Sequence, residues 1–204
     1  MFTGIVEELG EVVELVPGAD SARLTVRGPL VTSDAGPGAS IAVDGVCLTV
    51  VDLRDGSFTA DVMAETLGRS TLGGLAAGSR VNLERPVAAD GRFGGHVVQG
   101  HVDGTGTVTA RTPGDRWEVV RIGLPDALAR YVVEKGSVAV DGVSLTVAGV
   151  DEGGFTVALI PETLTRTTLG RRAVGDRVNL EVDVLAKYVE RLLPAAQPAT
   201  AVAR

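Results

Sequence analysis

The sequence contains two copies of one pattern, joined end to end. Three blocks recur in the same order and at the same separation: SIAVDGVCLTV (40–50) and SVAVDGVSLTV (137–147), MAETLGRSTLG (63–73) and IPETLTRTTLG (160–170), GSRVNLE (78–84) and GDRVNLE (175–181). A shorter match, one residue out of register, sets TGIV (3–6) against QGHV (99–102). The repeat is far longer than the roughly 20–50 residues of solenoid repeats, so each copy should fold around its own core.

Each copy has the local pattern of a small β-domain. In the first copy, runs rich in Val, Ile, Leu and Thr predict strands at residues 21–27, 41–51, 57–62 and 81–84. The pair Asp55-Gly56 between two of these runs predicts a hairpin, because both central residues of such a turn favour positive φ. About six short strands in a copy of this length are best closed into an antiparallel barrel, which leaves no sheet edge exposed.

Four helical segments are predicted beside the strands. Residues 65–73 and 162–170 indicate short helical turns that close at glycine, and residues 126–135 predict a helix present only in the second copy. Residues 183–193 predict an amphipathic helix, with Asp183 as its N-cap. Its apolar stripe consists of Val184, Leu185, Tyr188, Val189 and Leu192. Oligomerisation would bury this stripe, and packing back onto the helix's own barrel is the alternative.

Composition and charge exclude several classes of function. The chain has 204 residues, of which 45% are hydrophobic and 22% charged, as is ordinary for a globular protein of two small domains. Its formal net charge is −7 and its basic residues are scattered, so neither nucleic acid nor an anionic membrane is expected as a partner. The single cysteine, Cys47, excludes an intramolecular disulfide, and neither a signal-peptide pattern nor a membrane-spanning apolar run is visible. We therefore expect a cytoplasmic protein.

The duplication predicts the domain organisation directly. We expect one barrel over residues 1–88, a second over 96–183, a helix over 184–193 and a flexible tail over 194–204. The tail has the Pro- and Ala-rich composition of a loose chain end.

Positions at which the copies differ inside matched motifs are candidates for chemistry that is done only once. The four differences align Cys47 with Ser144, Ile5 with His101, Pro86 with Asp183, and Gly38 with Lys135. Each candidate also has a purely structural interpretation. These are a small buried thiol for Cys47, a strand-end hydrogen bond for His101, an ordinary strand serine for Ser144, a helix cap for Asp183, and a helix-end charge for Lys135.

The sequence predicts a site without a metal or a cofactor. His96 and His101 are an odd number of positions apart, so in an extended strand they would point to opposite faces. One cysteine and two histidines match no zinc spacing. Dinucleotide-binding, P-loop and nucleophile-elbow motifs are absent from the sequence.

Taken together, the motifs resemble one family. MFTGIVEE, DGVCLTV, MAETLGRSTLG, GGHVVQGHVDG, DGVSLTV, IPETLTRTTLG and VNLEVDVLAKYVERLL occur in the order found in the riboflavin synthase alpha chain family, and the likeness covers almost all of residues 1–193. The resemblance implies an all-β fold of two tandem six-stranded antiparallel Greek-key barrels plus a C-terminal α-helix, and a homotrimer assembled through those helices. One departure is Asp44, where relatives often carry Asn. Its counterpart Asp141 is already Asp, so a role in a turn explains both.

The resemblance also implies the reaction. Two molecules of 6,7-dimethyl-8-ribityllumazine react with each other, and one gives a four-carbon unit to the other. The products are riboflavin and 5-amino-6-ribitylamino-2,4(1H,3H)-pyrimidinedione, and the reacting pair sits between the first barrel of one subunit and the second barrel of its neighbour. No external cofactor is implied, because the ring system delocalises the carbanion formed at the 7-methyl group.

Carried over motif by motif, the resemblance implies two substrate pockets. The first barrel's set is Gly4, Ile5, Val6, Cys47, Leu48, Thr49, Asp61, Val62, Met63, Ala64, Glu65 and Thr66. The second barrel's set is Gly100, His101, Val102, Lys135, Ser144, Leu145, Thr146, Ile160, Pro161, Glu162, Thr163, Leu164 and Thr165. His101 and Ser144 are the implied proton-handling or nucleophile-supplying groups, with Asp183 orienting them and Cys47 beside the partner substrate.

Two other functions compete with this interpretation. Proteins similar to lumazine protein share the duplicated barrel and carry one bound pteridine or flavin without chemistry. The presence of Cys47, His101, Ser144 and Asp183 favours the enzyme over such a carrier. A flavin-dependent reductase is the second alternative, but no nucleotide-binding segment follows the barrels. The sequence leaves open whether the chain associates with lumazine synthase.

Overall fold

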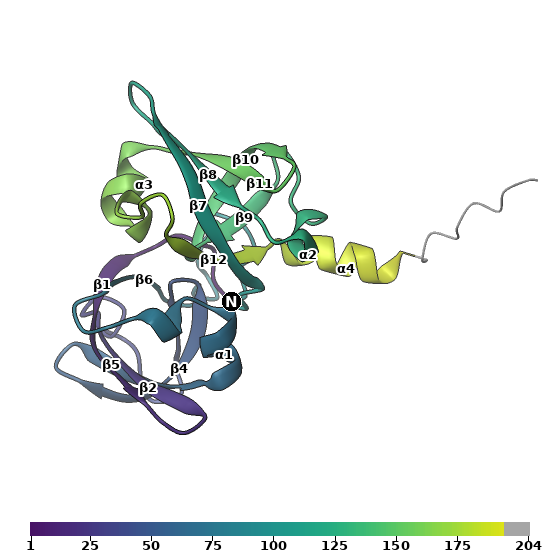
Figure 1. The fold of residues 1–204 in the computed structure, drawn as a ribbon. Helices are drawn as coiled ribbons and strands as arrows, with labels where there is room; N and C mark the ends of the chain where they lie inside the picture. The colour runs from purple at the N-terminus through teal and green to yellow at the C-terminus, as the bar shows by residue number, and fades with distance from the viewer. Residues whose placement is uncertain (194–204) are drawn as a thin grey trace, which may run out of the picture.

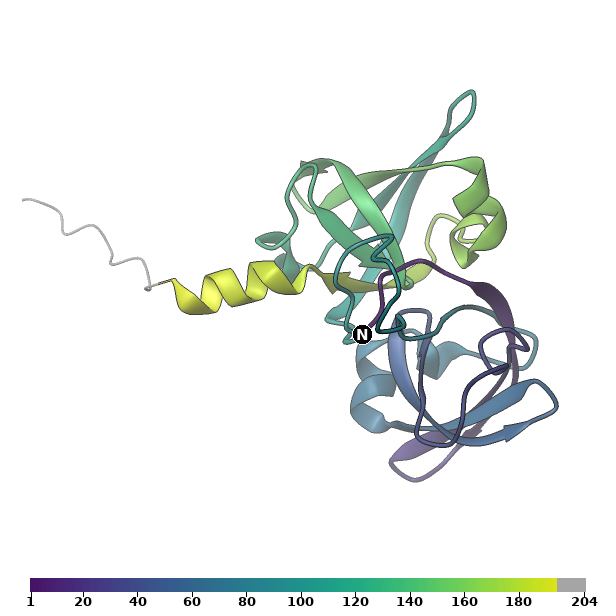
Figure 2. The same ribbon diagram turned by 180° about the vertical axis from the view of Figure 1, so that it is seen from behind.

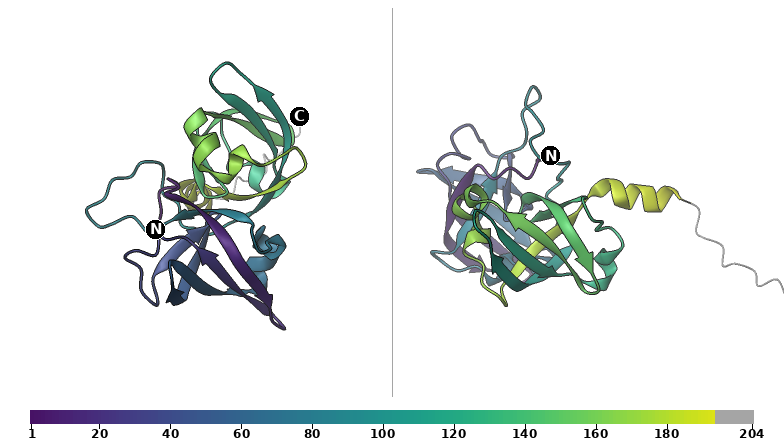
Figure 3. Two further views of the ribbon diagram at one scale, coloured as in Figure 1. Left: turned by 90° about the vertical axis from the view of Figure 1, so that its left-hand side faces the viewer. Right: turned by 90° about the horizontal axis from the view of Figure 1, so that it is seen from above.

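The computed structural model describes residues 1–193, which form two closed β-barrels followed by one helix (Figures 1 and 2). This is the predicted fold class. The N-terminus lies between the two barrels, and the last helix projects from the second barrel (Figure 3). The predicted flexible tail, residues 194–204, lies outside the described residues.

The first barrel has the Greek-key order β1-β2-β5-β4-β3-β6, in which every neighbouring pair of strands is antiparallel. Its elements are β1 (Glu8–Pro17), β2 (Ser21–Arg27), β3 (Ser40–Val43), β4 (Val46–Arg54), β5 (Ser57–Met63), helix α1 (Ala64–Arg69), the 3₁₀ turn η1 (Leu72–Gly74) and β6 (Arg80–Glu84). Inward-facing side chains fill the barrel around the fully buried Phe58. The alternation of buried and exposed residues along β2 and β5 is what a half-buried strand requires.

The second barrel repeats this topology strand for strand, with one additional helix, and Phe155 takes the place of Phe58 in its core. Its elements are β7 (Gly104–Pro113), β8 (Glu118–Gly123), α2 (Asp126–Ala129), β9 (Ser137–Val140), β10 (Val143–Asp151), β11 (Gly154–Leu159), α3 (Pro161–Arg166), η2 (Thr168–Gly170) and β12 (Arg177–Val182). The two cores are separate, as the length of the repeat predicted.

Two local predictions were wrong. Residues 41–51 are not one strand but a hairpin of β3 and β4, because Asp44 and Gly45 adopt φ of 44° and 80° and turn the chain. The helix predicted for residues 126–135 ends at Ala129. Beyond it, the side chain of Val132 is buried in the barrel core and Lys135 has φ of 66°, so the segment follows the barrel surface instead of continuing a helix.

The barrels are joined by reciprocal hydrogen bonds between matching residues of the two copies. The side chain of Asn82 donates to the backbone oxygen of Asp141 (2.8 Å), and that of Asn179 donates to the backbone oxygen of Asp44 (2.8 Å). All four residues are buried. Because each bond has its counterpart in the other copy, the two barrels face each other about an approximate twofold axis.

Two irregular segments, residues 2–6 and 98–102, run between the barrels, and we call them the crossing segments. They meet in an antiparallel bridge, in which Phe2 donates to Val98 (2.7 Å) and Val98 donates to Phe2 (3.1 Å). Phe2 and Val98 are buried in a small apolar cluster between the barrels. Each crossing segment therefore has a fixed position although it belongs to no barrel strand.

The C-terminal helix α4 (Val184–Leu192) begins at its predicted cap, where the Asp183 carboxylate accepts a hydrogen bond from the backbone of Leu185 (3.0 Å). Its contacts with its own barrel are polar, including an ion pair between Lys187 and Asp103 (2.6 Å). The predicted apolar stripe is left uncovered, and Leu192 is 81% exposed. Among residues 1–193, no helix combines the length and apolar character needed to cross a membrane.

Candidate functional site

One cavity lies on the outer face of the first barrel beside the single thiol, and we call it the Cys47 pocket. Its volume is about 350 Å³. Strand β4, helix α1 and the crossing segment form its walls, with the lining residues Val46, Cys47, Glu65, Thr66, Arg69, Ser70, Gly100, His101, Val102 and Asp103. Cys47 is half-buried there.

The second barrel has the corresponding cavity, which we call the Ser144 pocket. Its volume is about 220 Å³. Its lining consists of Gly4, Ile5, Val6, Val143, Ser144, Glu162, Thr163, Arg166 and Thr167. Every residue of this lining has its counterpart in the Cys47 pocket, so the duplication yields two cavities of one design. They differ chiefly at Cys47 against Ser144 and at His101 against Ile5.

The structure corrects the predicted grouping of the pocket residues, because the crossing segments are exchanged between the barrels. Residues 4–6, predicted in the first barrel's pocket, line the Ser144 pocket, where Ser144 N donates to Gly4 O (2.8 Å). Residues 100–102, predicted in the second barrel's pocket, line the Cys47 pocket, where Cys47 N donates to Gly100 O (2.9 Å). Each pocket therefore takes one wall from the other copy.

Glycine is required at the point where each crossing segment touches the opposite barrel. Gly4 and Gly100 adopt φ of 75° and 79°, which side chains rarely tolerate. A Cβ on Gly4 would lie 2.6 Å from Cβ of Ser144, and one on Gly100 would lie 2.6 Å from Cβ of Cys47. The backbone of each segment thus lies directly against the residue that distinguishes the pocket.

The exchange separates His101 from Ser144, which the sequence analysis had assigned to one site. His101 lines the Cys47 pocket, whereas the hydroxyl of Ser144 lies 2.7 Å from Nδ1 of His96. Burial lowers the pKa of His96, and the negative charge of Asp183 opposes that shift. Nε2 of His96 is buried and has no hydrogen-bond partner within residues 1–193.

Sequence reasoning gave His96 no role beyond the metal test. That test treated residues 96–101 as an extended strand, but His96 lies in an irregular stretch whose backbone bonds to Thr3 (3.2 Å). Residues 2–6 contact both His96 and Ser144, and this packing, not any local motif, brings His96 close to Ser144.

Several predicted residues line neither pocket with their side chains. Leu48 and Val62 point into the first core, and Leu145 and Leu164 pack against the second. Asp61 forms an ion pair with Arg23 (3.0 Å). Exposed positions around the two pockets are taken by Thr49, Met63, Ala64, Thr146, Ile160, Pro161 and Thr165. Lys135 is exposed beside Glu134, and its left-handed backbone matches that of Gly38 in the first copy.

Comparison with known proteins gives the family. The model of the lumazine binding domain matches the chain twice, at residues 3–86 and 99–183. The riboflavin synthase of Mycobacterium tuberculosis (strain ATCC 25618 / H37Rv) is 66% identical over 200 residues, which cover 96% of this chain and 100% of the relative. The riboflavin synthase of Bacillus subtilis (strain 168) is 43% identical over 96% of this chain and 91% of its own length. The chain belongs to the riboflavin synthase family.

Solved structures support the same fold. LumP complexed with riboflavin superposes with a TM-score of 0.83 at 24% identity, covering 89% of this chain and 99% of LumP. LumP complexed with 6,7-dimethyl-8-(1'-D-ribityl) lumazine gives a TM-score of 0.81 over the same shares. These likenesses show that the chain shares the fold of LumP.

Two arginines complete the pockets of this family member and were missing from the predicted set. Arg69 forms an ion pair with Glu65 (2.6 Å) in the Cys47 pocket, and Arg166 forms one with Glu162 (3.2 Å) in the Ser144 pocket. Both pairs are spaced one helical turn apart on α1 and α3. The motif ETL-x-R occurs in both copies, so its arginine was available as a signal.

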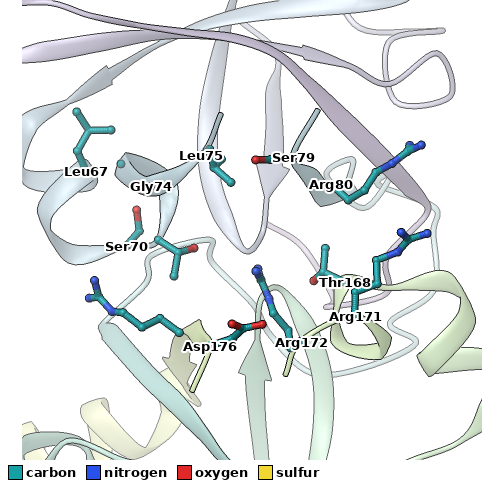
Figure 4. Close-up of a pocket in the computed structure, with 13 residues that line it drawn as sticks. Leu67, Ser70, Gly74, Leu75, Ser79, Arg80, Thr168, Arg171, Arg172 and Asp176 are labelled. Atoms are coloured by element: carbon teal, nitrogen blue, oxygen red, sulfur yellow. The ribbon is translucent and has the colours of Figure 1, made fainter. Parts of the chain in front are cut away.

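A larger cavity than either of these, of about 650 Å³, lies between the two barrels (Figure 4). No predicted site residue lines it. In Figure 4 the side chains of Arg80 and Arg171 extend to one side, whereas Arg172 stands at the centre. Arg172 is 2.7 Å from Asp141 and 3.4 Å from Asp44, both fully buried. The arginine side chains do not converge on one point, and the central one lies against the buried carboxyl groups of the barrel contact.

Metal ligands are not grouped in this structure. Within residues 1–193, no cluster of three or more His, Cys, Asp or Glu side chains is arranged to hold a metal ion.

Proposed function

We propose that this chain catalyses the reaction named by its relatives and converts two molecules of 6,7-dimethyl-8-ribityllumazine into riboflavin and 5-amino-6-ribitylamino-2,4(1H,3H)-pyrimidinedione. It does so by transferring a four-carbon unit from one molecule to the other. The observation that carries this proposal is the pair of corresponding pockets, one on each barrel. Donor and acceptor are the same compound, so two cavities of one design are what the reaction needs.

The two pockets work together in a homotrimer. The Ser144 pocket, at about 220 Å³, is smaller than the roughly 300–1,000 Å³ usual for ligand sites, so a second wall must enclose its ligand. The first barrel of one subunit faces the second barrel of its neighbour and supplies this wall. The uncovered stripe of α4, including Leu185 and Tyr188, forms the contact at the trimer centre.

Face-to-face binding supplies most of the rate enhancement. Holding two reactants in place converts a bimolecular step into a unimolecular one, which contributes about 7–11 kcal/mol in favourable cases. Met63 and Ile160 are the N-cap residues of α1 and α3, the helices that line the two pockets, and are 71% and 56% exposed. Apolar side chains at these matching rims suit the faces of two heteroaromatic rings.

His96 and Ser144 handle the proton in the Ser144 pocket. Because burial lowers the pKa of His96, its imidazole is neutral near pH 7 and Nδ1 accepts the proton of the Ser144 hydroxyl, 2.7 Å away. Asp183 supplies a negative charge that stabilises the imidazolium formed. Cys47 and His101 contact the other substrate from the Cys47 pocket. The substrate's own ring system delocalises the carbanion formed at its 7-methyl group, so no resident cofactor is invoked.

A colour assay tests the proposal. Purified protein given 6,7-dimethyl-8-ribityllumazine, without metal or nucleotide, should form one riboflavin for every two substrates consumed, and EDTA should not change the rate. Tight binding of the pteridine with no riboflavin formed would identify a carrier instead. A cytoplasmic location and an association with lumazine synthase stay predictions, to be tested by fractionation and co-purification.

A further inference from the structure

The last strand of each barrel places one buried glutamate beneath a crossing segment. Glu84 ends β6 and is 6% exposed, and Glu181 lies in β12 and is 3% exposed. Their neighbours across the sheet, Ala42 and Ala139, are small and apolar. A charged side chain at such a position needs specific partners.

Glu84 receives its hydrogen bonds from the N-terminal crossing segment. One carboxylate oxygen accepts from the backbone N (2.7 Å) and the hydroxyl (3.1 Å) of Thr3, and the other accepts from the backbone N of Gly4 (3.0 Å). The carbonyl of Gly4 in turn accepts from Ser144 N. Glu84, in the first barrel, therefore fixes the peptide that forms a wall of the second barrel's pocket.

Glu181 repeats this arrangement for the other crossing segment. Its oxygens accept from the backbone N of Gln99 (2.7 Å), Gly100 (3.0 Å) and His101 (2.9 Å). The carbonyl of Gly100 accepts from Cys47 N. Glu181, in the second barrel, therefore fixes a wall of the first barrel's pocket.

The crossing segments supply most of the compensation for these two buried charges. Within residues 1–193, neither Glu84 nor Glu181 forms an ion pair closer than 4 Å, so backbone N–H groups carry the interaction. Burial raises the pKa of both carboxyls, and the same N–H groups oppose that shift. Hydrogen bonds to a charged acceptor are about twice as strong as neutral ones. If either segment moved, its glutamate would lose these hydrogen bonds while still buried among apolar side chains. The energetic cost of that loss holds the segment in place.

We propose that Glu84 and Glu181 are positioning residues that act in a crossed manner. Glu84 sets the geometry of the Ser144 pocket, and Glu181 sets that of the Cys47 pocket. Each barrel thus sets the geometry of the other barrel's pocket. Any effect of the two glutamates on turnover rests on the function proposed above. Neither glutamate lines the Cys47 pocket or the Ser144 pocket.

The single thiol gives a direct test that does not depend on activity. In Glu181→Gln, the amide NH₂ faces at least one of three N–H donors, so residues 99–102 should loosen and alkylation of Cys47 should become about tenfold faster. Glu84→Gln should leave that rate unchanged. In a Cys47→Ser/Ser144→Cys background, the thiol lies in the Ser144 pocket. There Glu84→Gln should make alkylation faster, and Glu181→Gln should leave its rate unchanged. Glu152→Gln, in an exposed turn of β10 and β11, is the matched control.

Three outcomes would overturn the proposal. These are equal effects of both variants on both thiols, effects on the near barrel instead of the far one, or no effect at all. If the glutamine variants do not fold, hydrogen exchange of the backbone amides in the native protein tests the proposal instead. The amides of Gly4 and Gly100 should be strongly protected although they lie in no strand, and free exchange would contradict the positioning role.

Turnover then separates this proposal from the proposed function. In an active enzyme, each glutamine variant should raise KM, and the corresponding aspartate variants should bring KM part of the way back. If the thiol rates change as expected but no riboflavin is formed by the native chain, the function fails and the crossed positioning stands.

Discussion

Replacing Gly100 by alanine should lower the free energy of unfolding by about 2–5 kcal/mol. Two separate effects add. The residue has φ of 79°, and a left-handed backbone costs a residue with a Cβ roughly 1–2 kcal/mol. The new methyl group would also lie 2.6 Å from Cβ and 2.9 Å from N of Cys47, and overpacking of this kind costs typically ~1–3 kcal/mol.

Gly78 provides a control that isolates the backbone effect. It adopts φ of 86°, and no atom lies within 4 Å of the Cβ position. Gly78→Ala should therefore cost only about 1–2 kcal/mol. Urea denaturation of both variants, with equal slopes, measures the difference directly.

The same variants test the site. Gly100→Ala should weaken pteridine binding at the Cys47 pocket, because the clash pushes away the wall formed by residues 100–102. Gly78→Ala should not affect binding. If the two variants lose the same stability and bind equally well, the close approach of the crossing segment to Cys47 is incorrect.

Four further substitutions test the proton-handling pair, the buried carboxyl between the barrels and the assembly. Ser144→Ala and His96→Gln should each lower kcat by roughly 10²–10⁴-fold with little change in binding, and an equal loss in binding and rate would make these residues contacts only. Burial and the neighbouring Asp141 raise the pKa of Asp44 well above its usual value, so the folded chain holds that proton when the unfolded chain has lost it and stability falls as the pH rises from about 4. Asp44→Asn removes this titration, so its thermal midpoint relative to the native chain should increase as the pH is raised above about 4, and a constant difference would show that Asp44 is ionised throughout. Leu192→Asp, on the exposed stripe of α4, should dissociate the proposed trimer, and an unchanged mass in light scattering would refute that proposal.

The sequence predicted the paired barrels because the duplication and the strand patterns agree with each other. It failed where a decision depends on distant contacts. Residues 126–135 have the composition of a helix, yet Val132 is buried in the barrel core and the helix ends early. The pair Asp44-Gly45 was included in one predicted strand, residues 41–51, because apolar residues continue on both sides, although a role in a turn was also inferred for Asp44.

Only part of the predicted set of site residues lines the two pockets, and those residues are grouped differently from the prediction. A duplicated sequence makes the two halves locally alike, so no local pattern distinguishes a segment that packs on its own barrel from one that packs on the other. Comparing differences between the copies singled out Cys47 and Ser144, which do occupy equivalent places. The same comparison passed over Glu84 and Glu181, because they are identical in both copies and their importance lies in what they hold.

The exchange of segments also bears on how such a protein arose. A single barrel would lack one wall of its pocket, and two single barrels would complete each other's pockets by exchanging their N-terminal crossing segments. Fusing the two genes makes this exchange of segments permanent. Once fused, one cavity was free to keep a sulfhydryl while its twin kept an alcohol, which two identical polypeptides could never do.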